Sequence, residues 1–366
     1  MSRNLSVLVL ELHPYHLHNF SVYSNLLPSL FHCSNVSIEY CVLPEVIDNL
    51  VFPDKKLVHG LFPSKTWQAV LSKIRLRSVY LILLIRLLSF LKKIDCVILN
   101  TLESAADKRI FRSINTKLKI AIIHNPGAIK IKREKNALYF CMNEYIFDEI
   151  AGLALLDGYL LSYFRPVEFP VRVKQDDLII GIPGSVSFNR RDYYFLIEVC
   201  LMLAQQEKPG KKIVFNIIGD IRDKDGKELR RLIEERKLGR YFRFHEEIDD
   251  KEFSREVYEC DLLMPLLGEA HARYRSVKNT ATLSHSARYN RPLLLRKMDA
   301  ECWDIPLDGC VIYDEADDLA ELLMGMDSVS DDISSAYQRY INAKISKNRE
   351  LLSEFGKRVS IVEMLG

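Results

Sequence analysis

The amino-acid sequence predicts an α/β protein made of two domains, each built around a doubly wound parallel sheet. The chain has 366 residues, more than one compact hydrophobic core usually holds. Short apolar runs alternate with helical segments along its length, which is the pattern of parallel strands joined by helices. The alternation is interrupted at residues 164–170, where two prolines and no helical period indicate a linker.

The first half begins with a run rich in Val and Leu at residues 5–12, typical of a buried parallel strand. One long helix is expected over 66–93, and residues 44–63 are expected to form a loop because of their proline spacing and mixed polarity. The other strands expected here are 37–43, 96–99, 118–123 and 159–161, and the other helices are 19–31, 104–112 and 145–153.

The second half repeats the alternation. Its expected strands are 178–182, 212–218, 241–244, 262–264, 293–295 and 311–313, and its expected helices are 192–205, 227–238, 279–289, 316–324 and 332–357. Gly239 is expected to end the helix before it, and Asp249 with Glu252 resembles a capping box that starts another. We therefore expect domains over 1–166 and 171–344, with a C-terminal helix of about 345–366 packing back on the first.

Composition excludes several classes of protein. The net charge of +2 gives no reason to expect a nucleic-acid partner. The eight cysteines include no Cys-x-x-Cys pair, which disfavours zinc and redox sites, and scattered thiols in a large chain favour a reducing, cytoplasmic location. The N-terminal apolar run is too short for a signal peptide. No Gly-x-Gly-x-x-Gly follows a strand, so a dinucleotide dehydrogenase is disfavoured.

The loop after the first strand of the second half has the residues of a phosphate site. Gly184 would let the backbone approach a phosphate, and Ser185 adds a hydroxyl donor. Arg190 and Arg191 follow at the start of a helix, and paired arginines suit a diphosphate. The alternative is an ordinary tight turn with surface arginines, and it stays open at this point.

A second candidate phosphate site precedes the helix expected at 279–289. Small and hydroxyl residues at a helix start, with a lysine just before them, offer free N–H groups, a favourable dipole and a mobile cation. The residues concerned are Tyr274, Lys278, Asn279, Thr280, Ala281 and Thr282. The alternative is a plain N-capped helix with a solvated lysine.

Five short motifs occur in one order after these strands: the glycine loop with its arginines, Ile218-Gly219-Asp220, residues 244–248, residues 258–265, and Asn290-Arg291-Pro292. In this order they resemble the C-terminal donor domain of the GT-B glycosyltransferases of bacterial polysaccharide biosynthesis. The resemblance implies two Rossmann-like domains with an interdomain cleft, an N-terminal acceptor domain and a C-terminal nucleotide-sugar domain.

The resemblance also implies roles for residues of the donor domain. Gly184 and Arg190 would meet the donor diphosphate, residues 245–248 with His245 and Glu247 would line the nucleoside base, and residues 280–282 would grip phosphate. The donor is then a nucleotide-diphosphate sugar, with no other cofactor. The chain departs from the family where Val277 and His285 stand at the positions of the two glutamates of large retaining members.

For catalysis, the resemblance points to a histidine after a central strand of the first domain, and His124 stands there. Such a residue can act as a base or bond a transferred sugar, whereas the alternative is a loop histidine bonded to backbone. His13, His16 and His18 crowd the loop after the first strand and are further candidates, with His16 the one we select. Their spacing fits no metal-ligand pattern, so no metal is expected.

The helix expected over 66–93 is basic and very apolar between Arg75 and Lys93. Its apolar run is far shorter than the ~20 residues needed to span a bilayer. An interfacial helix on an anionic inner leaflet and a core helix with basic ends both fit, and both stay open.

The function expected from these features is sugar transfer from a nucleotide sugar to a carbohydrate acceptor in surface polysaccharide biosynthesis, without a metal. The basic helix suggests a lipid-linked acceptor at the inner face of the membrane. Two alternatives remain: a nucleotide-sugar epimerase on the same fold, and a non-catalytic GT-B protein acting as a binding or assembly subunit.

Overall fold

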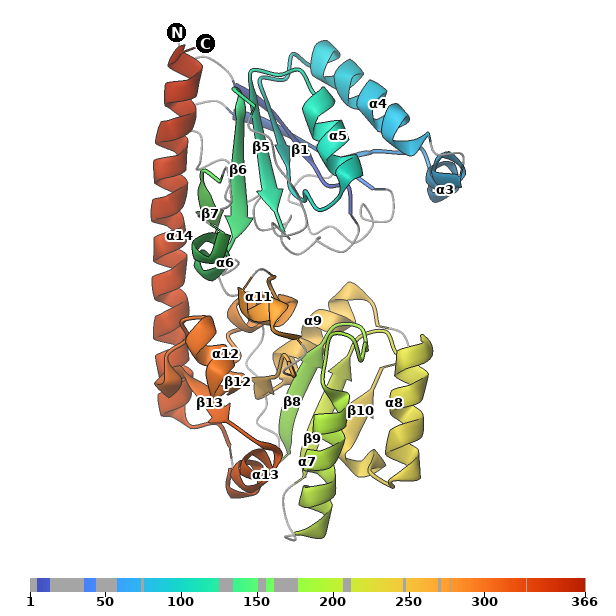
Figure 1. Cartoon of the computed structure of the whole chain (residues 1–366), viewed down its shortest axis with the longest axis vertical. Helices are drawn as coiled ribbons and strands as arrows, with labels where there is room; N and C mark the ends of the chain where they lie inside the picture. Colours follow the sequence, from blue (N-terminus) through green and yellow to red (C-terminus); the bar gives the residue numbers. More distant parts are fainter. Residues whose placement is uncertain are drawn as a thin grey trace. The chain divides into compact units, whose positions relative to one another are not determined.

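A computed structural model describes most of the chain as two compact units of α/β structure (Figure 1). Unit 1 comprises residues 1–162 and 347–366, and unit 2 comprises residues 163–346. The described residues are 5–13, 36–43, 58–73, 76–124, 134–150, 156–160, 177–206, 212–245, 248–268, 271–276, 278–326 and 328–365. The expected helix at 19–31 and the linker at 164–170 lie outside them. No helix among the described residues combines the length and the apolar character needed to cross a membrane.

Unit 1 is built on a seven-stranded sheet in which every pair of neighbouring strands is parallel. The strand order is β3 (Val58–Gly60), β2 (Val36–Val42), β1 (Leu5–Leu10), β4 (Cys96–Leu99), β5 (Leu118–Ile123), β6 (Ala137–Met142) and β7 (Gly158–Leu160). The strands β4, β5 and β6 are buried along their whole length, which explains why they are mostly apolar and do not alternate; the exception is Lys119 in β5, which pairs with Glu134.

Two strands of unit 1 differ from expectation. β3 lies where a loop was expected; three residues at the edge of a sheet leave too short a pattern to detect. β6 was missed although it is fully buried, because its sequence, Ala-Leu-Tyr-Phe-Cys-Met, contains no β-branched residue.

The helices described in the first 162 residues are α3 (Lys65–Lys73), α4 (Arg77–Leu91), α5 (Ala105–Ser113) and α6 (Glu144–Ile150). The single helix expected over 66–93 is therefore wrong, because two helices occupy this stretch. α4 is apolar on almost all sides, so its hydrophobic residues show no helical periodicity that could locate a helix boundary near Leu76. α5 begins where expected, since Ser104 and Asp107 form a reciprocal capping box.

Unit 2 contains a six-stranded parallel sheet in the order β10 (Phe242–Phe244), β9 (Ile213–Ile218), β8 (Leu178–Pro183), β11 (Leu262–Leu263), β12 (Leu293–Arg296) and β13 (Cys310–Tyr313). Its helices are α7 (Tyr193–Gln205), α8 (Lys224–Glu235), α9 (Asp250–Glu259), α10 (Arg273–Ser276), α11 (Ala281–Tyr289), α12 (Lys297–Cys302) and α13 (Ala316–Gly325). α7 and α13 pack together over this sheet. The two parallel sheets confirm the predicted fold class.

Local capping sets the bounds of two helices in unit 2. Asp223 accepts a hydrogen bond from the Gly226 N–H (2.7 Å), so α8 begins three residues before its expected start. Gly239 was expected to end α8, and this expectation is wrong. Lys237 already adopts the left-handed conformation, and Gly239 begins the next short turn. Asp249 caps α9 by accepting from the Glu252 N–H (2.7 Å).

The last helix, α14 (Asp331–Leu365), belongs to unit 2 up to residue 346 and to unit 1 from Lys347 onward. Within unit 1 the Lys347 ammonium is 2.6 and 2.7 Å from the two carboxylate oxygens of Glu144 in α6. It also lies 5.8 Å from the ring centroid of Tyr159 in β7. These contacts dock the end of the chain on the sheet edge formed by the last strands of unit 1.

Gly181 in β8 offers a test of the unit 2 core. A Cβ at this position would lie 2.6 Å from the Cys260 sulfur and 2.8 Å from a Leu263 methyl group. We expect Gly181→Ala to destabilise the protein by about 1–3 kcal/mol, because these neighbours are buried and cannot move aside freely. The measurement is the urea midpoint of the transition assigned to unit 2. Gly239→Ala is the control, since nothing lies within 4 Å of its Cβ position; equal effects of the two variants would contradict the prediction.

Candidate functional site

The strand order places a candidate ligand edge in each unit. In unit 2 the order reverses between β8 and β11, and in unit 1 it reverses between β1 and β4. Parallel doubly wound sheets bind ligands beyond the carboxyl ends of the strands at such a switch point. The residues that follow β8 and β11, and those that follow β1 and β4, are therefore the candidate ligand contacts.

The loop after β8 is held by its own backbone and by one arginine. Gly184 has a φ of +108°, which favours glycine, and its N–H donates to the Ile218 carbonyl (2.8 Å). Arg191 donates to the carbonyls of Pro183 and Ser185, so its guanidinium braces the loop. The Ser185 and Arg190 side chains are exposed at this edge. Of the two predicted arginines, Arg190 is thus the one that faces solvent.

The loop after β11 lies directly against the first loop. The Asp192 N–H donates to the Leu266 carbonyl (2.9 Å), and the Asp192 side chain caps α7 by accepting from the Phe195 N–H (3.1 Å). A Cβ on Gly268 would come within 2.5 Å of an Asp192 carboxylate oxygen. The loop after β8 and the start of the loop after β11, at Leu266 and Gly268, are therefore neighbours in unit 2.

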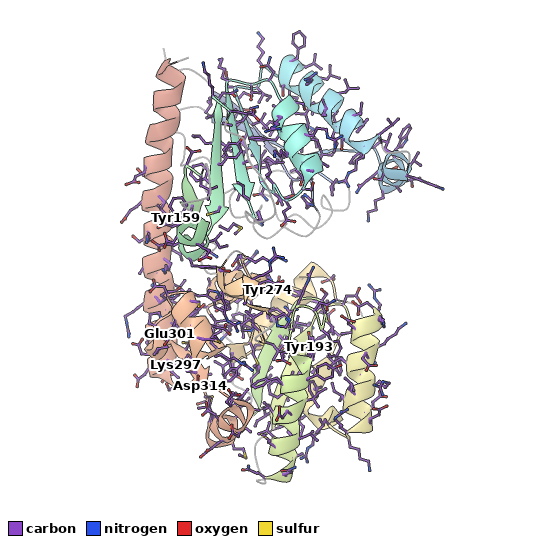
Figure 2. The ribbon with its side chains drawn as sticks, in the orientation of Figure 1. Tyr159, Tyr193, Tyr274, Lys297, Glu301 and Asp314 are labelled. Atoms are coloured by element: carbon purple, nitrogen blue, oxygen red, sulfur yellow. The ribbon has the colours of Figure 1, made fainter. Side chains whose placement is uncertain are left out.

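The segment from Tyr274 to Thr282 leads from α10 into α11. The Lys278 ammonium lies 5.2 Å from the centroid of the Tyr274 ring. Thr280 is the N-cap of α11 and accepts from the Thr282 N–H (3.4 Å). Ala281 is exposed, whereas the Thr282 side chain is fully buried and supports the helix start from inside. Tyr274 and Tyr193, the first residue of α7, both lie on the side of unit 2 that bears the carboxyl ends of the strands (Figure 2).

A buried ion pair that the sequence did not indicate supports this segment. The Arg275 guanidinium donates to the Asp299 carboxylate (2.5 Å) and to the Gly268 carbonyl (3.4 Å), so it ties the loop after β11 to α12. Burial raises the pKa of Asp299, although the hydrogen bond and charge of Arg275 pull it the other way. The partners are 24 residues apart, and no local motif marks them.

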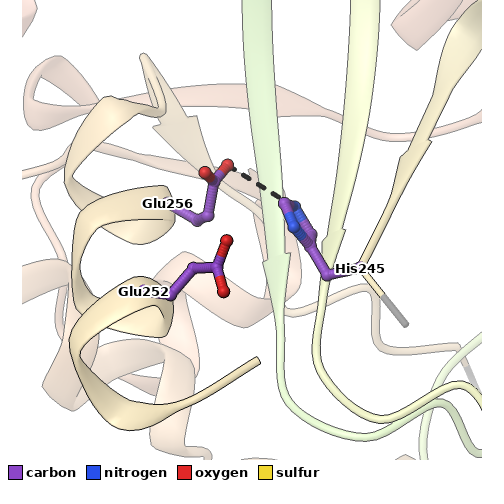
Figure 3. A group of neighbouring side chains, drawn as sticks. All are labelled: His245, Glu252 and Glu256. Carbon is purple, nitrogen blue, oxygen red and sulfur yellow. Dashed lines mark ion pairs between the residues drawn. The ribbon is translucent and has the colours of Figure 1, made fainter. Parts of the chain in front are cut away.

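The His245 side chain is only 12% exposed and faces Glu256 of α9 (Figure 3). Its Nε2 is 2.8 Å from Asn216 Oδ1 and 3.4 Å from a carboxylate oxygen of Glu256. One possible metal-ligand atom from each of His245, Glu252 and Glu256 lies within 4.8 Å of the others. Arg255 pairs with both carboxylates at 3.3 Å, however, and a cation would have to compete with it. Glu247 and Val277 lie outside the described residues, and so does His16.

In unit 1, a buried carboxylate links the ends of β1 and β4. Glu11 is fully buried and accepts hydrogen bonds from the Asn100 amide, the Thr101 hydroxyl (2.9 Å) and the His13 N–H (2.8 Å). His124 follows β5 at the same edge, and its Nε2 donates to the Asn100 carbonyl (3.1 Å). His124 is buried, so its described contact is the one expected of a histidine bonded to backbone.

Beside this network, His13 and Asp107 form a dyad. The His13 Nε2 lies 3.0 Å from the Asp107 carboxylate, which also accepts from the N–H groups of Glu103 (3.2 Å) and Ser104 (2.8 Å) at the start of α5. Asp107 is buried and His13 is partly exposed. A carboxylate facing Nε2 places the proton of the neutral ring there and makes Nδ1 the basic nitrogen.

The dyad shifts the pKa of both partners. Burial by itself lowers the pKa of His13, but the hydrogen bond and charge of Asp107, with smaller effects of Glu11 and Glu103, raise it above the ordinary 6.5. Burial raises the pKa of Asp107, yet hydrogen bonds from His13 and Ser104 outweigh it and lower that pKa. A histidine oriented by a buried carboxylate is the arrangement of a general base.

His13 was expected only as a further candidate, and Asp107 was not predicted to be its partner. The available signals were a histidine directly after the first strand and an acidic residue in the first turn of the helix after β4. These positions are 94 residues apart, and only the strand order joins them.

Comparison with known proteins identifies the fold. No protein-family model matches the chain, and no curated protein matches it. Among solved structures, sucrose-phosphate synthase from Thermosynechococcus elongatus matches with a TM-score of 0.65 at 11% identity, over 97% of this chain and 99% of that one. A glycosyltransferase from Rickettsia africae ESF-5 matches with a TM-score of 0.62 at 11% identity, over 99% and 98% of the two chains.

The same fold also occurs in a protein named as an epimerase. A putative UDP-N-acetylglucosamine 2-epimerase from Listeria monocytogenes matches with a TM-score of 0.54 at 9% identity, over 91% of each chain. The chain therefore has the double Rossmann-like GT-B fold predicted from its sequence. The fold by itself does not separate sugar transfer from epimerisation, so the choice between them depends on the site.

The dyad predicts a measurable titration. We expect His13 to titrate above 6.5 in the wild-type protein and at lower pH in Asp107→Asn, because the variant keeps the burial that lowers its pKa and loses the negative charge that raises it. The measurement is an NMR titration of the histidine rings, with His13 assigned by its absence in His13→Gln. Asp95→Asn is the control, since Asp95 pairs with Lys117 elsewhere in unit 1. An unchanged His13 titration in Asp107→Asn would rule out the dyad.

Proposed function

We propose that the protein is a metal-independent glycosyltransferase that moves a sugar from a nucleotide-diphosphate donor to a carbohydrate acceptor. The observation that carries the proposal is the His13–Asp107 dyad at the switch point of one GT-B unit, with two phosphate-type loops at the switch point of the other. We further propose that unit 1 binds the acceptor and unit 2 binds the donor.

Unit 2 supplies the groups that the leaving diphosphate needs. Negative charge develops on this group as the bond to the sugar breaks, so fixed donors and cations lower the barrier. We assign this task to Ser185 in the loop that Gly184 shapes, to Arg190 and Lys278, and to the start of α11 at Thr280 and Ala281. Arg191 positions the glycine loop, and Arg275 positions the loop after β11. Tyr274 and Asn279 complete the proposed donor edge.

His13 is the proposed general base. Its Nδ1 takes the proton of an acceptor hydroxyl while the oxygen forms a bond to the anomeric carbon, and the bond from that carbon to the diphosphate oxygen breaks with its electron pair. Asp107 stabilises the imidazolium that results. One displacement of this kind inverts the anomeric centre. His124 stays a second candidate for contact with the transferred sugar.

The glutamate pair of large retaining relatives has no counterpart here. His285 occupies one of its positions, but it is buried in α11 with its ring 5.1 Å from the Phe253 ring and 6.3 Å from the Tyr289 ring. A residue packed in this way is part of the core of unit 2. The absence of the glutamate pair supports a reaction that inverts the anomeric centre. It is also consistent with the alternative of a binding subunit without activity.

The proposed setting is the assembly of a surface polysaccharide on a lipid-linked acceptor, with the protein in the cytoplasm and in peripheral contact with the inner face of the membrane. The support for this setting is the basic, apolar stretch around α4, since a lipid-linked acceptor would keep the enzyme near a bilayer. No nucleic-acid partner is proposed.

The donor site predicts selective nucleotide binding. In a thermal-shift panel of nucleoside diphosphates, we expect one base to raise the melting temperature clearly, because a ligand that binds only the folded state stabilises it by mass action. Arg190→Ala and Lys278→Ala should abolish the shift. Lys212→Ala is the matched control, since Lys212 precedes β9 and lies at the opposite edge of the same sheet. If no nucleotide stabilises the wild-type protein, the donor site is wrong.

The base predicts a specific loss of turnover. With the donor found by this panel, His13→Ala should lower the release of nucleoside diphosphate roughly 10²- to 10⁴-fold, the usual contribution of a general base. Activity should fall as the pH drops through the raised pKa of His13, because the protonated ring cannot accept a proton, and Asp107→Asn should shift this limb to lower pH. His59→Ala is the control.

Each alternative has its own outcome in this assay. A change in the sugar of the nucleotide sugar without any acceptor would support the epimerase and contradict the transferase. Nucleotide binding without any turnover across a panel of acceptors would support the binding subunit. A product with retained anomeric configuration would contradict His13 as the base of a single displacement.

A further inference from the structure

The outer face of α3 and α4 in unit 1 is apolar and exposed. It carries eight large apolar side chains, each between 47 and 81% exposed, which we call the outer stripe. They are Trp67, Val70, Leu76, Val79, Leu83, Leu87, Phe90 and Leu91. Exposed apolar residues scattered singly need no explanation, but eight of them gathered on two consecutive helices indicate an interaction surface.

Helical geometry shows that the outer stripe is a face of its own. Leu81 and Ile85, four residues apart, are the buried residues of α4 and form its inner face. Val79, Leu83 and Leu87 are also spaced by four, and at 100° per residue they lie on the opposite side. A surface helix normally carries polar side chains there. In Figure 1, α4 lies beyond α5 at the periphery of unit 1, with α3 near its N-terminal end.

The charges around the outer stripe point to an anionic occupant. Residues 65–93 contain seven Lys and Arg and no Asp or Glu. Lys65, Lys73 and Lys93 are exposed on these helices and around their ends. Arg86 donates to the Ser113 carbonyl (3.0 Å) and Lys92 pairs with Glu39 (2.6 Å), so part of the positive charge is anchored to unit 1. A segment of apolar side chains and cations that contains no acid of its own matches the boundary between acyl chains and anionic headgroups.

The dimensions of α4 require that it lie on a bilayer and not cross it. At 1.5 Å per residue its 15 residues span about 22 Å, less than the ~30 Å of a hydrocarbon core. The aromatic side chains of Trp67 and Phe90 are 55 and 81% exposed, and Trp in particular favours the headgroup region. The face that binds is thus the outer side of α4, with the exposed side chains of Trp67 and Val70 on α3 near its N-terminal end.

We propose that the outer stripe is a membrane-docking surface that inserts its apolar side chains among the acyl chains of an anionic bilayer, with the neighbouring lysines at the headgroups. The inference rests on the peripheral location proposed above and deepens it by naming the surface. It requires no sugar transfer, so it is tested without any assay of activity.

The test is co-sedimentation of the full chain with vesicles. We expect binding to vesicles of 70% phosphatidylcholine and 30% phosphatidylglycerol, and binding at least about tenfold weaker to pure phosphatidylcholine or at 0.5 M salt. The variant Leu83→Ser/Leu87→Ser/Phe90→Ser should lose at least about tenfold in partitioning, since burial of these side chains drives insertion. Met298→Ser/Leu307→Ser is the matched control, because both residues are exposed apolar residues of unit 2.

Three results would overturn the proposal. The first is wild-type binding no stronger to anionic than to neutral vesicles, and the second is equal binding by the triple variant and the wild-type protein. The third is a wild-type dimer that the triple variant converts to a monomer while vesicle binding stays the same, which would assign the outer stripe to a second copy of the chain. The nucleotide-induced thermal shift, measured on the same variant, reports on the donor site, so failure of one proposal is distinguished from failure of the other.

Discussion

Glu11 is fully buried at the carboxyl end of β1, and its carboxylate oxygens are satisfied by donors from the protein itself. An unpaired carboxylate in such a place would be strongly destabilising. The donors to this carboxylate are Asn100 and Thr101 after β4, together with the backbone N–H of His13. The ends of two strands on either side of the switch point are thereby joined, and the backbone that carries His13 is held in place.

In unit 2, a cation satisfies the polar groups at the switch point. Its switch point exposes backbone carbonyls of the loop after β8, and Arg191 donates to two of them. The Asp192 N–H then joins this loop to the one after β11, and Arg275 reaches the second loop from the buried pair with Asp299. Both loops are thus shaped by protein contacts before a ligand arrives. Such preorganisation is what makes fixed dipoles effective against a developing charge.

The fold could be predicted because buried parallel strands have a strong local signature. The apolar runs of β1 and β8, and a cap such as Ser104 of α5, can be recognised within a few residues of sequence. β6 lacks that signature because it contains no β-branched residue, and α4 hides its own start because it is apolar on every side. These errors concern elements whose identity depends on tertiary packing.

The candidate site combines motifs that are local in the sequence with pairs of residues that are distant in it. The loop with Gly184 and the helix start at Thr280 are contiguous motifs, and the structure places both at the carboxyl edge of one sheet. The partner of His13 comes from another helix, and the partner of Arg275 comes from α12. Pairs of this kind become visible only when the strand order is known, and no pattern in a single sequence supplies that order.

The two halves of α14 belong to different units, and this division has a consequence for biosynthesis. Unit 2 is a continuous segment, whereas unit 1 is assembled from both an early and a late part of the chain, and its late part includes the Lys347 contact to Glu144. On the ribosome, where domains generally fold as units in order of synthesis, unit 1 must wait for residues made after unit 2. Synthesis of unit 2 begins after that of unit 1, yet unit 2 is the first whose residues are all available for folding. The edge of the unit 1 sheet near α6 and β7 is therefore covered last.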